Sequence, residues 1–331
     1  MKKAILMANI LNGFLVKNIK KAAKYLRKSE PVVFPTETVY GLGAKVYDRK
    51  GVVKIFEIKQ RPFFDPLIVH IANLKQLKEV AKVEDERVYL LIKTFWPGPL
   101  TLVLPKQKCV PYLVTAGLDT VAVRMPANPI ALSLIQEINS PIAAPSANLF
   151  SQLSPTTAQH VEKQLSKRAK IILDGGKTIW GLESTIVALT KNKKPIILRA
   201  GGLPIEEIEK IIGKVIIKKK NKKVLAPGGL QTHYAPSKPL LLVHREEEIP
   251  KFKNPKIKIG FLAFQKIKKK KQFVDYKILS PKGDMKEAAS NFFDYLHQLD
   301  EGPAEIIYAE KIPEVGLGKA MMERLIKAAH Q

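Results

Sequence analysis

The sequence contains a single cysteine, Cys109, among its 331 residues. One cysteine cannot form an intramolecular disulfide or a metal site built from several thiolates, so we expect a chain that works in the reducing cytosol. Long apolar runs are also lacking, because no segment approaches the roughly 18 consecutive apolar residues of a membrane span. Asn9 and Asn12 interrupt the apolar stretch near the start, and no small-residue cleavage site follows. We therefore expect neither a signal peptide nor a membrane partner.

Arginine is scarce relative to lysine, although the formal net charge is +26. Only nine of the 56 basic residues are arginine, and the lysine runs at 214–223 and 266–271 lack the interleaved aromatic side chains that stack on bases. This pattern is typical of a solvated basic surface, whether from an AT-rich coding bias or from heat adaptation. Weak RNA contact through this surface stays open, as does the alternative of a non-catalytic RNA-binding protein. Lysines gathered on one concave face would favour that alternative.

Several common catalytic motifs are absent. No Gly-x-Ser-x-Gly, His-Glu-x-x-His or paired-cysteine motif occurs, which argues against a serine hydrolase and a zinc enzyme. The run Gly-Gly-Lys-Thr at 175–178 resembles the end of a phosphate-binding P-loop, but the first glycine of that motif would fall on Ile171.

The first two-thirds of the sequence alternates apolar strands with amphipathic helices. Strand-like runs lie at 32–34, 67–71, 100–104, 120–124, 141–144, 171–173, 184–189 and 196–198, and helical periodicity covers 17–28, 49–59, 74–81, 85–95, 128–138, 156–166 and 204–212. This alternation predicts one α/β domain over residues 1–215.

A linker is predicted over residues 216–238, because repelling lysines followed by proline and glycine cannot build a core. Residues 239–331 then form a second α/β pattern, with strands near 239–243, 257–263, 274–279 and 305–308 and helices near 284–299 and 316–329. Its continuous apolar runs are typical of buried parallel strands. We expect a small, doubly wound, Rossmann-like domain.

The segment 35–44 reads Pro-Thr-Glu-Thr-Val-Tyr-Gly-Leu-Gly-Ala and follows an apolar run. On an extended backbone, the hydroxyls of Thr36, Thr38 and Tyr40 would share one face. The glycines at 41 and 43 allow a tight turn or the close approach of a ligand. A small polar molecule could bind there, although an ordinary turn would explain the segment taken alone.

Cations stand where predicted elements end. Lys59 and Arg61 close the helix 49–59, where they could clamp a polyphosphate or simply interact with the helix end. Arg124 ends an apolar strand and must leave the core or find an anion, such as a substrate carboxylate. Ser146 and Asn148 follow another strand, and ligands of open α/β sheets bind beyond the carboxyl ends of strands.

Four motifs, taken in order, resemble those of the YrdC-like threonylcarbamoyl-AMP synthases: Pro-Thr-Glu-Thr-Val-Tyr-Gly-Leu-Gly at 35–43, Lys-Gln-Arg-Pro at 59–62, Ser-Ala-Asn at 146–148 and Glu-Ser-Thr-Ile-Val at 183–187. The resemblance continues at 117–126, 154–157, 233–236 and in the tail at 316–325, so it spans nearly the whole chain in the long, two-domain form. It implies a twisted mixed sheet with helices forming an open cleft, followed by the extra C-terminal α/β domain.

The resemblance implies a reaction. L-Threonine and bicarbonate (or CO2) give N-carboxythreonine, whose carboxylate attacks the α-phosphate of ATP and releases pyrophosphate. The product, threonylcarbamoyl-AMP, supplies a separate tRNA threonylcarbamoyltransferase complex that modifies the adenosine beside the anticodon. This chemistry needs charge neutralisation and in-line positioning, with Mg2+ sharing the triphosphate charge, and no organic cofactor.

The resemblance also implies a site. The threonine side falls on Thr38, His70, Arg124 and Ser184 with the backbone of Ala144, and the ATP side on Lys59, Arg61, Asp65, Thr120, Ser146, Asn148, Ser154 and Arg199, with His233 or Tyr234 from the linker. We assign no general acid or base and no protein ligand to a metal. We expect Arg61 to be exposed in a cleft, over which the linker closes to exclude water.

The sequence departs from the family pattern at Asp65, where asparagine is usual, and at Ala200, where proline is usual. Leu149 and Phe150 stand where arginine and serine are frequent, so we expect one phosphate contact of the family to be missing. A relative used for carbamoyl transfer in hydrogenase maturation is the other alternative. That type carries cysteine-rich zinc segments, which one cysteine cannot supply.

Overall fold

Eleven strands of the first two-thirds of the chain form one mixed sheet in the computed structural model, which describes residues 9–190, 193–217, 234–250 and 257–329. The strands are, in the order in which they lie side by side, β1 (Asn9–Asn12), β8 (Ile171–Asp174), β2 (Val32–Phe34), β3 (Gly41–Lys45), β7 (Ile142–Ala143), β4 (Ile68–His70), β6 (Thr120–Arg124), β5 (Leu100–Pro105), β9 (Thr185–Ala188), β10 (Ile196–Arg199) and β11 (Ile216–Ile217). Parallel and antiparallel pairs alternate irregularly along it, which confirms the mixed sheet expected from the resemblance.

The helices of this unit are α1 (Val16–Arg27), α2 (Arg49–Lys59), α3 (Leu74–Val80), α4 (Arg87–Phe95), α5 (Tyr112–Thr115), α6 (Pro129–Ile138), α7 (Ala158–Leu165) and α8 (Ile205–Ile212), with a short 3-10 turn, η1 (Ser166–Arg168). Along β2 the side chains alternate between two cores. Val32 and Phe34 pack with α1 and α6, whereas Val33 packs with α2 and α7 on the other face. Both faces of this half of the sheet are therefore covered.

The other half of the sheet is covered less evenly. On one face of β4, β5, β6 and β9, a small apolar cluster consists of Ile68, Val103, Ala122 and Ile186, with no helical residue among its described members. The opposite face of the same strands packs against α4 and α8 through the main core. The helix-free face leaves room for a cleft, and Ile68 lies in the wall of the pocket described below.

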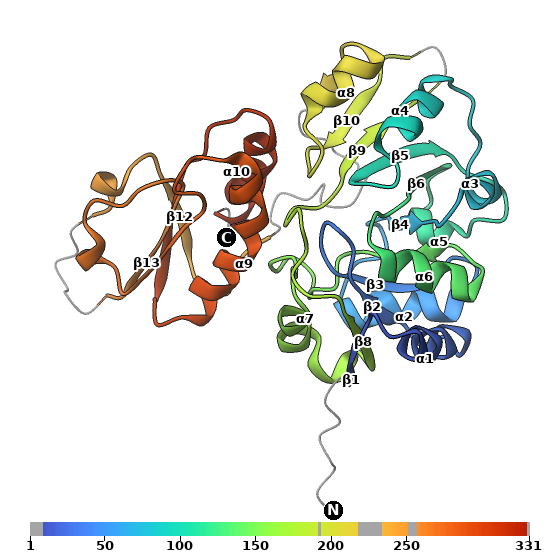
Figure 1. Ribbon diagram of the computed structural model, residues 1–331, viewed down its shortest axis with the longest axis horizontal. Coiled ribbons are helices and arrows are strands. Elements are labelled where there is room, and N and C mark those ends of the chain that lie inside the picture. The colour runs from blue at the N-terminus through green and yellow to red at the C-terminus, as the bar shows by residue number, and fades with distance from the viewer. Residues whose placement is uncertain (1–8, 191–192, 218–233, 251–256, 330–331) are drawn as a thin grey trace, which may run out of the picture.

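Residues 240–329 form the small unit at the left of Figure 1. Its sheet is wholly parallel, with the order β12 (Leu240–Val243), β15 (Ile306–Glu310), β13 (Ile259–Ala263) and β14 (Asp275–Ile278). It also contains the helices α9 (Met285–Glu301) and α10 (Leu317–Ala328) and the 3-10 turns η2 (Glu246–Glu248) and η3 (Lys270–Gln272). The parallel α/β domain expected here is confirmed.

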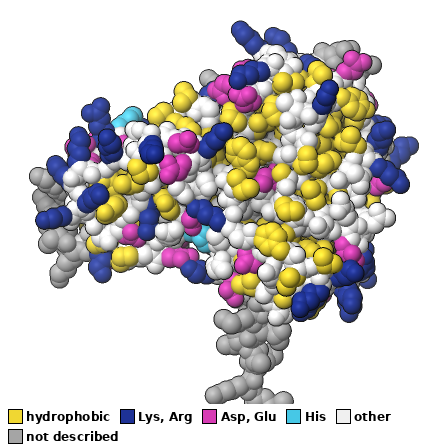
Figure 2. All heavy atoms as spheres, viewed as in Figure 1, with side chains coloured by type: hydrophobic (Ala, Val, Ile, Leu, Met, Phe, Trp, Pro, Cys, Tyr) yellow, Lys and Arg dark blue, Asp and Glu magenta, His cyan; other side chains and the backbone are white. Residues whose placement is uncertain are grey.

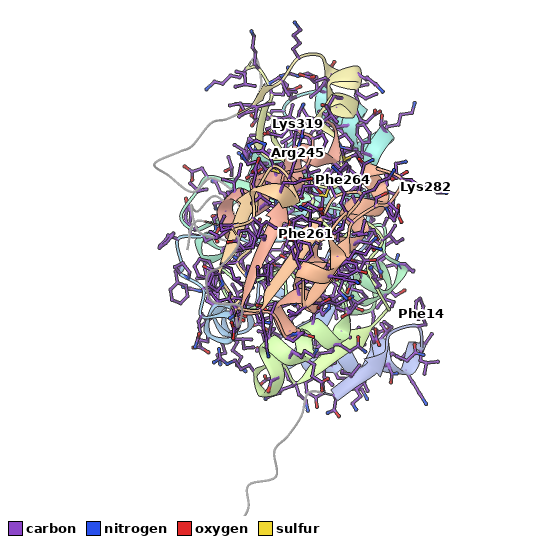
Figure 3. All side chains as sticks on the ribbon, turned by 90° about the vertical axis from the view of Figure 1, so that its left-hand side faces the viewer. Phe14, Arg245, Phe261, Phe264, Lys282 and Lys319 are labelled. Atoms are coloured by element: carbon purple, nitrogen blue, oxygen red, sulfur yellow. The ribbon has the colours of Figure 1, made fainter. Side chains whose placement is uncertain are left out.

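The expected doubly wound arrangement of this unit is wrong in one respect. Both α9 and α10 pack on the same face, with Leu262 and Ile307. The other face, with Phe261 and Tyr308, is covered by residues of connecting segments such as Phe273, whose ring stacks on Phe261 at 4.7 Å. Figure 3 looks at the small unit and places Phe261 over the middle of its sheet. The connections after β12 and β13 carry no α-helix in their described parts, so no α-helix of the described residues covers that face.

The element boundaries predicted from periodicity lie within a few residues of the observed ones in most cases. The helix 49–59 matches α2, whereas β1, β3 and α5 were not predicted. β11, expected in the linker, pairs in parallel with β10 and belongs to the large sheet. The linker residues 218–233 lie outside the described residues, so its expected closure over the site stays a prediction.

Candidate active site

A pocket opens where several strands of the large sheet end together. In the register of the parallel pair β4 and β6, His70 lies beside Arg124, so both strands deliver their last residue to the same edge. β9 begins at this edge and β10 ends there with Arg199. The wall of the pocket is made by Thr36, Thr38, Val39, Tyr40, Gly41, Arg61, Ile68, His70, Arg124, Ala144, Pro145, Ser146, Glu183, Ser184, Arg199 and Tyr234. The sheet topology thus gathers residues from far apart in the chain.

The segment between β2 and β3 is a tight turn and not the extended strand end expected from its hydroxyls. The hydroxyl of Thr36 donates to the carbonyl of Val39 (2.6 Å) and accepts from the amides of Thr38 and Val39 (both 3.2 Å), a pattern that closes the turn. Tyr40 sends its hydroxyl away to the carbonyl of Gly176, 2.7 Å distant. The hydroxyls of Thr36 and Thr38 lie together, 2.7 Å apart, whereas that of Tyr40 points away from them and joins the turn to the segment after β8.

Arg124 does find an anion, but within the protein. Its Nη2 lies 2.6 Å from Oε1 of Glu37, Nη1 donates to the Thr38 hydroxyl at 2.9 Å, and Nε donates to the carbonyl of Gly98. Both Arg124 and Glu37 are about 3% exposed, and among the described residues the Glu37 carboxylate oxygens have no polar partner besides this ion pair. Glu37 was missed in the sequence, where it lies between the two threonines of the segment. Through Glu37 and Thr38, the turn between β2 and β3 holds the Arg124 guanidinium in place.

His70 is a neutral imidazole at the wall of the pocket. Burial, with the neighbouring Arg124 charge as the second cause, lowers the pKa of His70 to about 3. The Nδ1 atom lies 3.2 Å from the carbonyl of Ile68, which can only accept, so Nδ1 carries the proton. The ring packs edge-on against Phe34. A neutral histidine here can bind a polar group without competing with Arg124 for an anion.

The opposite wall joins β9 to the end of β10. Arg199 donates from Nε and Nη2 to the carbonyl of Ser184, at 3.1 and 2.9 Å, and the Ser184 hydroxyl pairs with that of Thr101 at 2.7 Å. Glu183 precedes Ser184, and its Oε1 accepts from the hydroxyl of Ser154. This wall therefore carries one carboxylate beside the Arg199 guanidinium.

The helix end at 59–61 takes part in two buried networks. The ammonium of Lys59 donates to the carbonyls of Ser146 and Asn148, both at 2.5 Å, and burial lowers its pKa well below the ordinary value. Arg61 is 6% exposed, lies 2.8 Å from Oδ2 of Asp65 and donates to the carbonyl of Pro66. The expectation that Arg61 is exposed is wrong, because its side chain is buried in the ion pair with Asp65. Arg61 nevertheless forms part of the pocket wall.

Comparisons with known proteins agree with this geometry. A family model described as "Telomere recombination" (Sua5/YciO/YrdC) matches residues 24–201, and one described as "Threonylcarbamoyl-AMP synthase, C-terminal domain" matches residues 203–330. The curated threonylcarbamoyl-AMP synthase of Pyrococcus abyssi is 45% identical over 94% of both chains. The chain belongs to the threonylcarbamoyl-AMP synthase family.

Other members of the family support the same assignment. The synthase of Bacillus subtilis is 43% identical, covering 94% of this chain and 92% of its own. A crystal structure of P. abyssi Sua5 complexed with L-threonine superposes with a TM-score of 0.88 over 94% of both chains. The family, the enzyme class (a nucleotidyltransferase) and the threonylcarbamoyl-AMP synthase activity expected from the sequence are thus confirmed, and the RNA-binding protein without catalysis is set aside.

Not every residue predicted for the family's site lies on the pocket wall. Thr120 starts β6 while Arg124 ends it, so about 13 Å of extended strand separates them, and the structure does not bring Thr120 to the pocket. Five predicted residues lie off the wall: Lys59, Asp65, Thr120, Asn148 and Ser154. Except for Thr120, each of them contacts a wall residue. Four of the five therefore lie directly behind the wall.

The linker contributes one described residue to the wall. Tyr234 is 2% exposed, adopts a left-handed backbone conformation (φ 65°) and packs near the Phe293 ring of α9. His233, expected beside it, lies outside the described residues. Within the described ranges, no cluster of three or more His, Cys, Asp or Glu side chains is arranged to hold a metal ion. None of the described helices is long and apolar enough to cross a membrane.

Proposed function

We propose that this pocket binds L-threonine beside ATP and joins the two through bicarbonate. The observation that carries the proposal is Arg124, a buried arginine held on three sides by Glu37, Thr38 and the Gly98 carbonyl at the edge of the sheet. An arginine prepared in this way is suited to a carboxylate, and the threonine bound to the P. abyssi relative supplies a precedent. We propose Thr38, His70, Ser184 and the Ala144 backbone as the rest of the threonine subsite.

The ATP subsite is proposed on the cationic side of the pocket, at Arg61, Ser146, Arg199 and Tyr234, with His233 as a further member from the linker. Both arginines are buried and lie on the wall, and such cations bind phosphates strongly where water is excluded. Lys59, Asp65, Asn148 and Ser154 are proposed to act from behind, since they hold Ser146, Arg61 and Glu183. Thr120 lies at the opposite end of β6 from Arg124, so its position does not support a place in the ATP subsite.

The reaction follows from this arrangement. The neutral threonine amine forms an N–C bond to CO2, which bicarbonate supplies by losing hydroxide, and the amine proton is released as the carbamate forms. The new carboxylate oxygen attacks the α-phosphorus while the bond from that phosphorus to the pyrophosphate oxygen breaks, so pyrophosphate leaves. The arginines and Tyr234 hold the two substrates in line and shield the mixed anhydride from water. The carboxylates at this site, Glu37, Asp65 and Glu183, are each paired with an arginine, so Mg2+ would be held by the triphosphate, whose charge it neutralises.

The proposal extends to the surroundings of the enzyme. We propose a cytosolic location, as the single cysteine led us to expect, and a downstream tRNA threonylcarbamoyltransferase complex that consumes the product. Weak RNA contact remains a minor part of the proposal. In Figure 2 the basic side chains are scattered over both units and along the rim, with hydrophobic side chains at the centre of the large unit. On this view nothing resembles a single basic hollow.

The proposal is tested by the release of pyrophosphate from labelled ATP with the full-length chain. We expect release only when both L-threonine and bicarbonate are present, and release that is indifferent to threonine would contradict the proposal. In the double variant Arg124→Gln/Glu37→Gln, which leaves no unpaired buried charge, we expect the KM for threonine to rise by about tenfold or more. Arg27→Gln, at an exposed ion pair with Glu137, is the control.

A further inference from the structure

The small C-terminal unit packs directly behind the residues that form the active-site pocket. An apolar cluster shared by the two units joins Val39 and Leu182 of the large unit to Phe293 and Met321 of α9 and α10. Val39 lies on the pocket wall, and Leu182 precedes the wall residue Glu183. In Figure 1 the two helices lie between the small sheet and the large unit. The contact between the units therefore reaches the site itself.

Arg324 of α10 is a buried charged residue at this contact, where it is 1% exposed. Its Nε and Nη2 both lie 2.9 Å from Oε2 of Glu183, and its Nη1 donates to the carbonyl of Ala200 at 2.8 Å. The guanidinium also stands over the Tyr234 ring, 5.2 Å from its centre. One side chain of the C-terminal unit thus touches three segments of the pocket: the start of β9, the turn after β10 and the linker residue.

The charge balance of the wall depends on Arg324. Burial alone would raise the pKa of Glu183, but Arg324, and after it Arg199, outweigh burial and lower that pKa to about 2. Glu183 is therefore ionised and needs a compensating cation in its dry surroundings. Arg324 supplies that cation directly, at 2.9 Å. Without Arg324, the ionised Glu183 would lose its nearest cation on the side of the pocket proposed for the triphosphate.

We propose that Arg324 is a positioning residue for ATP, through which the C-terminal unit completes the active site. It neutralises Glu183 and holds the Ala200 turn and Tyr234 in place, so that Arg199 and Tyr234 face the nucleotide. This inference rests on the proposed function, namely on ATP binding at the Arg199 side of the pocket. It gives the C-terminal unit a role in substrate binding beyond that of a covering layer.

Equilibrium binding of ATP to the full-length chain, together with KM values for ATP and threonine, tests the inference. In Arg324→Met, the ionised Glu183 loses its nearest cation and repels the triphosphate, so we expect ATP affinity to fall by about tenfold or more while the KM for threonine changes far less. In Arg324→Met/Glu183→Gln no ionised carboxylate is left without its cation, and we expect most of the lost ATP affinity to return. A role limited to docking the two units would instead make the double variant no better than the single one.

The control is Lys319→Met on the same helix, labelled in Figure 3, which removes an ion pair of 2.6 Å between the units at Glu206, away from the pocket. We expect its ATP affinity to be unchanged. Should Arg324→Met fail to fold, the double variant Arg324→Met/Glu183→Gln tests the inference by itself. ATP binding within a few-fold of that of the unmodified chain supports the inference, and lost ATP binding overturns it. Undiminished ATP binding by Arg324→Met would overturn the inference alone, whereas absence of ATP binding by the unmodified chain would overturn it and the proposed function together.

Discussion

At the scale of single residues, charges in this site are held in buried pairs. Arg124 pairs with Glu37, Arg61 with Asp65 and Arg324 with Glu183, and all six side chains are at most 6% exposed. A buried pair contributes little net stability, because desolvation offsets most of the attraction, but losing one partner is costly. The pairs therefore fix where each guanidinium points, and this geometry is what substrate binding needs.

The pair of Arg61 and Asp65 gives a prediction about stability. Arg61→Ala leaves Asp65 buried without its cation, so we expect the free energy of unfolding to fall by about 3–5 kcal/mol as well as activity to be lost. In Arg61→Ala/Asp65→Asn, which restores the asparagine usual in the family, we expect stability to recover while activity stays lost. Urea unfolding and pyrophosphate release measure the two effects. Recovered activity in the double variant would remove Arg61 from the ATP subsite.

At the scale of secondary-structure elements, the close approach of two segments shapes the wall. A Cβ at Gly201 would lie 2.3 Å from the carbonyl oxygen of Glu183 and 2.4 Å from the Ser184 carbonyl carbon, both rigid backbone atoms. A Cβ at Gly202 would meet its nearest atom, in Pro99, at 3.4 Å, an ordinary contact. The turn after β10 thus needs glycine at the first position and only tolerates it at the second.

This difference predicts opposite outcomes for two similar substitutions. We expect Gly201→Ala to push the turn away from β9, lowering the free energy of unfolding by about 1–3 kcal/mol and weakening ATP binding, since Arg199 and Ala200 move with it. Gly202→Ala should leave both properties close to those of the unmodified chain. Thermal unfolding and ATP binding check the pair, and equal behaviour of the two variants would contradict the close approach.

Some elements could be predicted from the sequence and others could not, because only some of them are determined by their own residues. Helix α2 has its own N-cap at Asp48 and a left-handed C-cap at Gln60, so local chemistry determines both of its ends. β11 has two exposed residues and exists only because β10 offers a free edge, so local composition placed it in the linker. The segment 35–40 carries strand-like spacing of hydroxyls, yet the hydroxyl of Thr36 closes a turn there.

At the scale of the whole molecule, two stacked histidines join the units. His160 of α7 lies on His297 of α9 with ring centres 3.9 Å apart, and His297 also contacts the carbonyl of Ser154. Burial, and then the neighbouring His297, lowers the pKa of His160 to about 3, and burial lowers that of His297 as well. Asp294 opposes the shift of His160, while Lys163 and Lys177 add to it. Both rings are therefore neutral in the folded state.

The sign of the pH effect follows from these shifts. Between pH 6.5, near the pKa of an unfolded histidine, and about 3, the unfolded chain binds more protons than the folded one, so acid lowers stability in this range. We expect His160→Gln to be destabilised most at pH 8, where the stack is intact. Its deficit in melting temperature relative to the unmodified chain should shrink by pH 5. A deficit that does not vary with pH would contradict the neutral stack.

The sequence by itself determined the family, the reaction class, the alternation of strands and helices and several of the residues that line the pocket. These properties are carried by contiguous motifs and by local periodicity, which a sequence displays directly. Only the tertiary structure decided that Glu37 holds Arg124, that Arg61 is buried by Asp65, that Thr120 lies off the pocket and that Arg324 reaches Glu183. These pairings depend on the register and direction of strands in a mixed sheet and on the docking of the second unit, and neither has a local signature in the chain.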